Sequence, residues 1–146
     1  MDAYIPASYV HSETARLDLY KRIAALESEE EEMDLQDELI DRFGDIPFPV
    51  QQLIVIAGLK RLAHEAYMTE VSGGRSKLKF VMYEKAPVDS DRMLALIENY
   101  KGELRFFTEH SSYFQYEPFQ KGKNDKENWL LFVKNMINEI KMLLVL

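Results

Sequence analysis

The chain has 146 residues, 47% of them hydrophobic, so it is long enough to form one domain around its own core. It contains no cysteine, which excludes disulfide scaffolds, cysteine nucleophiles and thiolate zinc sites and leads us to expect a cytoplasmic protein. Its longest apolar runs, such as residues 142–146, fall far short of the roughly 20 residues that cross a bilayer, and residues 1–10 show no signal-peptide pattern.

The net charge of −7 is concentrated in one segment. Residues 27–38 contain eight carboxylates and no lysine or arginine. Affinity for nucleic acid depends on lysine and arginine side chains that neutralise phosphates. Because the acidic segment would repel a duplex and no basic face can be read elsewhere, we expect no direct binding to nucleic acid.

The N-terminal part of the chain predicts an arm followed by a helix. Residues 1–11 mix tyrosine, isoleucine and valine with a proline, which favours an extended arm or an edge strand. Ser12 can cap a helix over residues 12–26, whose apolar side chains share one stripe. The glutamates of residues 27–32 predict a charged break after that helix.

Two more helices are predicted before the pattern changes. The first covers residues 32–43, with Leu35, Leu39, Ile40 and Phe43 directed inward. Gly44 is suited to end it, and Pro47 prevents it from continuing. Pro49 can open the next helix, which should reach about residue 68 and is apolar on nearly all sides.

The second half predicts a small, mostly antiparallel sheet. Residues 68–71 and 78–83 favour a β-hairpin whose turn contains Gly73 and Gly74. The remaining predicted elements are a helix capped by Asp89 or Ser90 and running through residue 97, strands over residues 104–108 and 113–116, a polar loop over residues 120–127, and a last helix from about residue 126. We therefore expect a single α+β domain over residues 1–146, with a helical part at 12–68 and a sheet with two helices at 69–146.

No motif for catalysis, a cofactor or a metal stands out. His11, His64 and His110 do not have the spacing of metal ligands on a helix. Residues 73–77 superficially resemble a phosphate-binding loop but lack its Gly-Lys-Ser/Thr ending and its strand–loop–helix setting, so a hairpin turn is the better interpretation. We expect a domain without enzymatic activity, without a cofactor and without a bound metal.

The helix at residues 32–43 carries the one pattern that indicates a function. At 100° per residue, Leu35, Leu39 and Phe43 lie within about 80° of one another and anchor the helix. Carboxylates lie on the opposite side: Glu38 and Asp41, three residues apart, flanked by Asp34 and Asp37. Such a ridge can bind an arginine-bearing protein through bidentate pairs, and the alternative is an ordinary solvated face.

Three stretches of the chain resemble the C-terminal domain of bacterial transcription-repair coupling factors (Mfd, the TRCF family). They are Tyr4-Ile5-Pro6, the stretch TARLDLYKRIA at residues 14–24, and the stretch ELIDRFGDIP at residues 38–47. A proline-opened third helix and a tryptophan at the start of the last helix follow in the same order. The specific part of the resemblance covers about residues 4–65, and over residues 70–125 only the layout of elements is compatible.

The resemblance implies a function that composition alone does not. The parent would be an ATP-driven DNA translocase that displaces stalled RNA polymerase and recruits UvrA for nucleotide excision repair, with ATP and Mg²⁺ held by its motor domains. In that family the C-terminal domain is non-catalytic and docks on a UvrB-like N-terminal module, where it covers the surface that binds UvrA. The family's acidic contacts map onto Glu38 and Asp41, whereas Asp34 and Asp37 have no such counterpart.

Two other functions stay open at this point. The chain could be an acidic binding module that recruits a separate protein, which a pull-down without affinity for the parent's own N-terminal module would indicate. It could also be a small enzyme, which a deep pocket with a strongly perturbed carboxylate or histidine would indicate.

Overall fold

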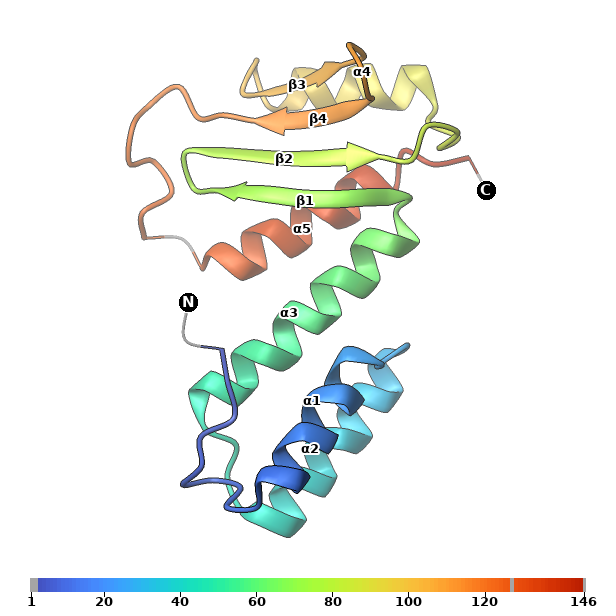
Figure 1. The fold of residues 1–146 in the computed structure, drawn as a ribbon. Coiled ribbons are helices and arrows are strands. Elements are labelled where there is room, and N and C mark those ends of the chain that lie inside the picture. The colour runs from blue at the N-terminus through green and yellow to red at the C-terminus, as the bar shows by residue number, and fades with distance from the viewer. Residues whose placement is uncertain (1–2, 127, 146) are drawn as a thin grey trace. The chain divides into compact units, whose positions relative to one another are not determined.

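The computed structural model of the chain describes residues 3–126 and 128–145 (Figure 1). This part of the chain contains five helices and one four-stranded antiparallel sheet, which confirms the predicted α+β class. The chain divides into two compact units, Met1–Arg61 and Leu62–Leu146. That both units belong to one domain stays a prediction.

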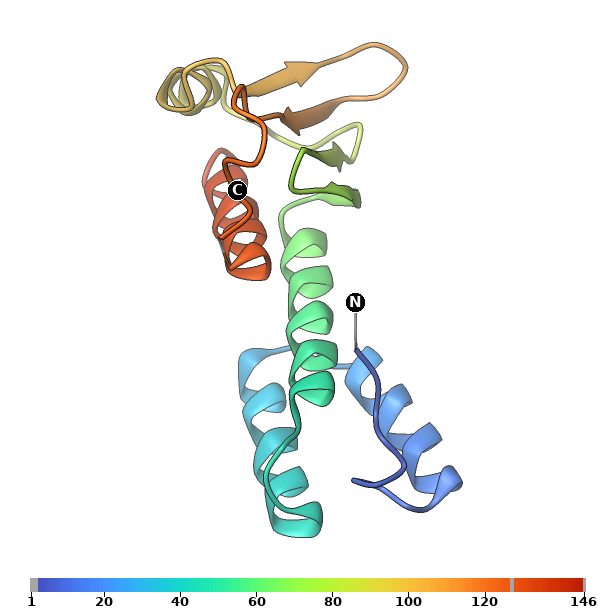
Figure 2. The same ribbon diagram turned by 90° about the vertical axis from the view of Figure 1, so that its left-hand side faces the viewer.

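The first unit is helical. It contains α1 (Glu13–Ala24), α2 (Glu29–Phe43) and the first part of α3 (Phe48–Glu65), with α1 and α2 on either side of α3 in Figure 2. Its core consists of side chains that are at most 4% exposed: Ile5, Val10, Leu19, Ile23, Leu35, Leu39, Val50 and Ile54. The three apolar helix faces predicted from the sequence therefore pack on one another.

The N-terminal arm differs from the prediction, because residues 3–11 form no strand. The backbone N–H groups of Tyr9 and Val10 both donate to the carbonyl of Pro6, at 3.0 and 3.1 Å, which makes a turn. The hydroxyl of Tyr20 accepts from the N–H of Ile5 at 2.8 Å. The arm is thus held by its apolar side chains against helices rather than by a sheet edge, and residues 1 and 2 lie outside the described residues.

The charged break predicted at residues 27–32 is wrong, because α2 begins at Glu29. Ser28 caps the helix by accepting from the N–H of Glu31 at 3.1 Å, and the Glu31 carboxylate accepts from the N–H of Glu27 at 2.6 Å. The pair resembles a capping box, except that Glu31 accepts from the residue before the N-cap rather than from the N-cap itself. Four glutamates in the first turn also stabilise the positive end of the helix dipole, so the charges start the helix instead of interrupting it.

Other helix boundaries shift by a few residues. Ser12 caps α1 as predicted, but the helix ends at Ala24. Helix α3 starts at Phe48 and ends at Glu65, before the predicted residue 68. Tyr67 follows with a φ of 60°, outside the helical region, and the chain turns into the first strand.

The second unit is a sheet with helices on one face. It contains β1 (Met68–Gly74), β2 (Lys77–Met82), α4 (Ser90–Asn99), β3 (Leu104–Phe107), β4 (Tyr113–Tyr116) and α5 (Trp129–Lys141). The strand order is β1-β2-β4-β3, and every neighbouring pair is antiparallel. Helices α4 and α5 lie on the same face of the sheet in both views (Figures 1 and 2).

Alternation along the strands fixes which side chains face these helices. The buried strand residues of the second unit are Met68, Leu78, Phe80, Met82, Leu104, Phe114 and Tyr116. They pack with buried residues of α5, namely Val133, Met136, Ile137 and Ile140. The opposite face of the sheet carries the polar and half-buried side chains of the same strands.

Helix α5 starts at Trp129, three residues later than predicted, and Asn128 caps it by accepting from the N–H of Leu131 at 3.3 Å. The predicted loop over residues 120–127 forms turns as far as residue 126, and Glu127 lies outside the described residues. No helix within the described ranges is long and apolar enough to cross a membrane.

Candidate protein interface

Helix α2 holds the predicted site on a well-anchored backbone. Leu35 and Leu39 are 2% and 1% exposed in the core of the first unit, so the opposite side of the helix is directed to solvent. Asp34, Asp37 and Asp41 are exposed there, as the sequence predicts. The structure therefore brings three of the four predicted carboxylates to one solvent-facing side.

Glu38 is different, because its carboxylate is already bound within the chain. Arg22 of α1 forms a bidentate pair with it, with Nη1 2.7 Å from Oε2 and Nη2 2.9 Å from Oε1. Arg42, one turn further along α2, donates from Nη1 to Oε2 at 2.9 Å. Both oxygens of Glu38 are thus engaged by arginines of the same unit.

The electrostatics of Glu38 agree with this geometry. Hydrogen bonds from Arg22 and then Arg42 lower the pKa of the Glu38 carboxyl from 4.5 to about 2, against a smaller opposing effect of burial. The hydrogen bond to Glu38 likewise raises the pKa of the Arg22 guanidinium. The pair is fully charged at neutral pH, and it ties α1 to α2 across 16 residues of sequence.

This arrangement changes how the predicted site is interpreted. A carboxylate that already accepts three hydrogen bonds from two arginines has little capacity left for a partner's arginine. Glu38 therefore holds the two helices together in the free chain, while Asp41 is the exposed carboxylate of the pair. The sequence predicts both carboxylates on the outward side of the helix; the structure adds that Arg22 and Arg42 bind Glu38, and the role of both carboxylates in docking stays a prediction.

The same side of α2 also exposes two apolar side chains that the sequence analysis missed. Met33 is 64% exposed, and Ile40, expected to point inward, is 48% exposed. Met33, Asp37, Ile40 and Asp41 are spaced by four, three and one residues, so they lie along one side of the helix. We call these four residues the α2 face. A wheel drawn from Asp37 instead of Leu35 would have revealed Met33 and Ile40 beside the carboxylates.

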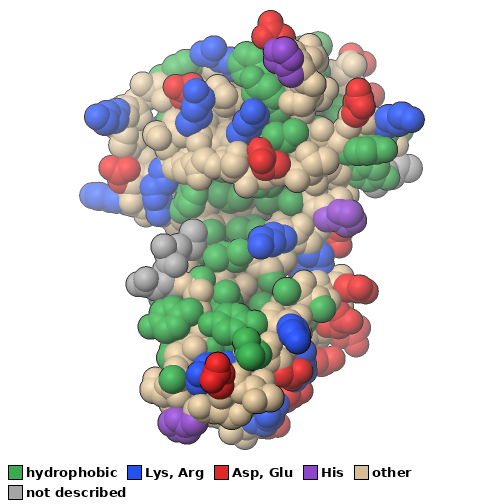
Figure 3. All heavy atoms as spheres, viewed as in Figure 1, with side chains coloured by type: hydrophobic (Ala, Val, Ile, Leu, Met, Phe, Trp, Pro, Cys, Tyr) green, Lys and Arg blue, Asp and Glu red, His purple; other side chains and the backbone are tan. Residues whose placement is uncertain are grey.

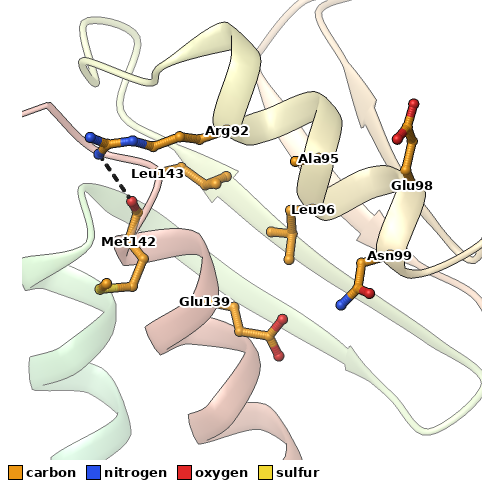
Figure 4. Close-up of a pocket in the computed structure, with 8 residues that line it drawn as sticks. All are labelled: Arg92, Ala95, Leu96, Glu98, Asn99, Glu139, Met142 and Leu143. Atoms are coloured by element: carbon orange, nitrogen blue, oxygen red, sulfur yellow. Dashed lines mark hydrogen bonds between the residues drawn. The ribbon is translucent and has the colours of Figure 1, made fainter.

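The second unit contains an open groove between α4 and α5 (Figure 4). Its volume is about 680 Å³, and its lining consists of Arg92, Ala95, Leu96, Glu98, Asn99, Glu139, Met142 and Leu143. Arg92 donates to the carbonyl of Met142 at 3.4 Å, and Glu139 accepts from the hydroxyl of Tyr100 at 2.7 Å. Arg92 and Glu139 are thus engaged within their own unit, and the lining residues of the groove include no serine, threonine, histidine or lysine that could form a nucleophile–base pair.

The three histidines, His11, His64 and His110, are all exposed. Within the described residues, no group of three or more histidine, aspartate or glutamate side chains is placed to hold a metal ion. The β1–β2 turn consists of residues 75 and 76, so Gly73 and Gly74, which the sequence predicts in the turn, instead end β1, where Gly73 has a φ of 105°. The hairpin interpretation of this glycine-rich stretch is confirmed.

Comparison with known protein families shows to which family the chain belongs. The family model of the TRCF domain matches residues 1–93, which include the whole first unit and the α2 face. The chain belongs to the TRCF domain family. The match ends within α4, so it also covers the hairpin of the second unit.

Proteins of this family that resemble the chain are bacterial transcription-repair-coupling factors. The factor of Staphylococcus epidermidis is 37% identical over 89 residues, which are 61% of this chain and 8% of that protein. The factor of Bacillus subtilis is 29% identical over 143 residues, which are 97% of this chain and 12% of that protein. The chain therefore spans about a tenth of the length of these relatives.

The fold has a counterpart among solved structures. The crystal structure of the C-terminal domain of a transcription-repair coupling factor aligns with a TM-score of 0.65 and 24% sequence identity, over 97% of this chain and 90% of that one. The TRCF family thus connects the chain to transcription-repair coupling, and the shared architecture extends beyond the part matched by the family model.

Proposed function

We propose that the chain is a non-catalytic, autoinhibitory interaction domain of a transcription-repair coupling factor. In this proposal it docks on the UvrB-like N-terminal module of its parent and masks the surface that binds UvrA. ATP and Mg²⁺ act in the motor domains of the parent, outside this chain, and the parent works in the cytoplasm on stalled RNA polymerase.

The α2 face is the observation that supports the proposal. It combines the exposed carboxylates of Asp37 and Asp41 with the exposed apolar side chains of Met33 and Ile40 on one rigid helix. Apolar contact supplies affinity, while carboxylates select a partner that carries arginine or lysine. Ile40 and Asp41 belong to the ELIDRFG stretch that resembles the family.

Asp41 and Glu38 then have different roles. Asp41 is exposed and can pair directly with an arginine of the N-terminal module. Glu38 keeps α1 and α2 in register through Arg22 and also engages Arg42. Glu38 is therefore a positioning residue in this proposal, and Asp41 is the contact residue.

Because the domain is tethered to the rest of its parent, a modest free energy of docking is sufficient to keep the UvrA-binding surface masked. A domain connected by a short flexible linker reaches an effective concentration of about a millimolar, so docking with a dissociation constant of about 10 μM keeps roughly 99% of the molecules closed. At this ratio the closed form is favoured by about 2.7 kcal/mol, so strain during translocation would need to supply only that much free energy to make the open and closed forms equally populated.

The test compares the affinity of the full-length parent for UvrA, without DNA or nucleotide, in three single variants. Asp41→Asn should bind UvrA about tenfold more tightly or better, because the partner's arginine loses its counter-charge. Glu84→Gln removes one charge from an exposed carboxylate of the second unit and should leave the affinity unchanged. Glu38→Gln should give an intermediate gain.

If wild type and Asp41→Asn have equal affinities for UvrA and equal melting temperatures, the docking role of the α2 face is refuted. If the isolated chain bound another protein but not the UvrB-like module, the acidic recruiting module would be the correct function instead.

A further inference from the structure

The face of the sheet opposite α4 and α5 gathers cationic and aromatic side chains. Strand pairing places Ser72, Lys79, Gln115 and Arg105 in one row across the four strands. The residues before and after Lys79 and Gln115 on their strands are buried, so this row points away from the helices. The next row contains Glu70, Val81, Tyr113 and Phe107. We call these eight residues, together with Lys77 of β2, the open sheet face.

The cations of this face have no carboxylate partner. Within the described residues, no aspartate or glutamate forms an ion pair with Lys77, Lys79 or Arg105. The strands themselves contain one carboxylate, Glu70, at the β1 edge. Figure 3, which views this side of the second unit, shows Lys and Arg side chains among hydrophobic ones, together with Asp and Glu side chains.

The aromatic side chains are arranged with the cations. The rings of Phe107 and Tyr113 are stacked, with centroids 5.1 Å apart and planes 23° apart. Nζ of Lys79 lies 4.2 Å from the centroid of the Tyr113 ring. Both aromatic residues are only partly buried, although aromatic side chains of this size normally gain most from full burial.

These features fit an anionic ligand that also has flat apolar surfaces. We propose that the open sheet face binds single-stranded RNA, with Lys77, Lys79 and Arg105 on its phosphates and Phe107, the outer ring of the Phe107–Tyr113 stack, against a base. Cations that follow the backbone, together with aromatic side chains that stack on bases, are the general basis of single-strand binding. An acidic peptide would satisfy the cations but offer no ring to the aromatic pair.

The neutral polar groups of the face favour RNA over DNA. Gln115 lies between Lys79 and Arg105 in the row, Ser72 pairs with Lys79 on its other side, and Tyr113 precedes Gln115 by two residues on β4. An amide and two hydroxyls can donate to and accept from a 2′-hydroxyl, which DNA lacks. A flat sheet face does not enter a duplex groove, so this proposal differs from the duplex binding that the acidic sequence argues against.

The test uses the 146-residue chain and a fluorescein-labelled oligouridylate of about 20 nucleotides, followed by anisotropy between about 50 and 200 mM salt. Single strands release about 0.7 counterion per neutralised phosphate, so three cations predict a log–log salt slope of about −2. The variant Lys79→Ala with Arg105→Ala should bind at least tenfold more weakly, and the magnitude of its log–log salt slope should decrease from about 2 to about 0.7.

The matched control removes two lysines from the first unit, Lys21→Ala with Lys60→Ala, and should bind like wild type. Phe107→Leu should weaken binding with little change in the salt slope, because it removes stacking on a base but no charge. Absent binding, or equal loss in the control pair, would overturn the proposal. Equal affinity for oligothymidylate would overturn the choice of RNA, and displacement by polyglutamate at equal charge concentration would identify an acidic protein segment as the ligand.

Discussion

The ion pair between Arg22 and Glu38 predicts a pH-dependent contribution to stability. Hydrogen bonds from Arg22 and Arg42 lower the pKa of the Glu38 carboxyl from 4.5 to about 2, so the charged form stabilises the folded state. The Glu38 side chain is 36% exposed and that of Arg22 is 40% exposed, so solvent and salt reduce this contribution to about 1 kcal/mol. For Glu38→Gln we expect a melting temperature about 2–4 °C lower at neutral pH.

The sign of the pH dependence follows from the depressed pKa. A carboxyl whose folded pKa lies below its unfolded pKa stabilises the folded state fully above about pH 4.5, and this stabilisation is lost as the pH falls towards 2. The difference in unfolding free energy between wild type and Glu38→Gln should therefore shrink over that range.

Chemical denaturation at pH 7 and pH 3, in a double-mutant cycle with Arg22→Gln, measures both effects. Asp41→Asn is the control, since an exposed carboxylate without such a pair should change stability by less than about 0.5 kcal/mol. A coupling energy near zero, or the same loss at both pH values, would refute the assignment of Glu38 as the tie between α1 and α2.

Three further substitutions test the second unit by chemical denaturation. Gly73→Ala should destabilise the hairpin by more than about 1 kcal/mol, because its φ is 105° and an added Cβ would lie 2.1 Å from the carbonyl oxygen of Lys77. Phe114→Ala should cost about 3–5 kcal/mol, since this side chain is fully buried in the sheet core. Asn124→Ala should cost about 1–3 kcal/mol, because Nδ2 of this 4% exposed residue donates to the hydroxyl of Tyr116 at 3.0 Å.

The sequence predicted elements well where the signals are local. Ser12 and Asp89 act as helix caps, and Gly73 and Gly74 end β1 directly before the hairpin turn. These features depend on a few adjacent residues, so periodicity and turn chemistry are sufficient to predict them. The predicted start of α2 is three residues late although its signal is also local, because the N-cap Ser28 and its partner Glu31 lie in a run of glutamates.

The features that were not predictable join distant parts of the chain. The i,i+4 spacing of Glu38 and Arg42 can be read from the sequence, but the pair with Arg22 exists only once α1 packs against α2. Likewise, Lys79 and Arg105 become neighbours of Gln115 only through the order β2-β4-β3. A charge count along the chain therefore located the acidic segment and missed the basic side chains that the sheet brings together.

The separation of Glu38 from Asp41 yields a last prediction, which distinguishes a docking contact from a structural one. If Asp41 contacts the partner and Glu38 only supports α2, then Asp41→Asn should weaken docking and leave the melting temperature unchanged, whereas Glu38→Gln should lower the melting temperature.

In Glu38→Gln, Arg22 and Arg42 would also lose their carboxylate and place net positive charge beside the α2 face, which weakens attraction for an arginine-bearing surface. Raising the salt concentration should therefore bring the docking affinity of Glu38→Gln closer to that of wild type. For Asp41→Asn the loss of a direct hydrogen-bonded pair should persist at high salt. Titration calorimetry with the isolated UvrB-like module at two ionic strengths measures both responses, and the same salt dependence in both variants would show that the two carboxylates act alike.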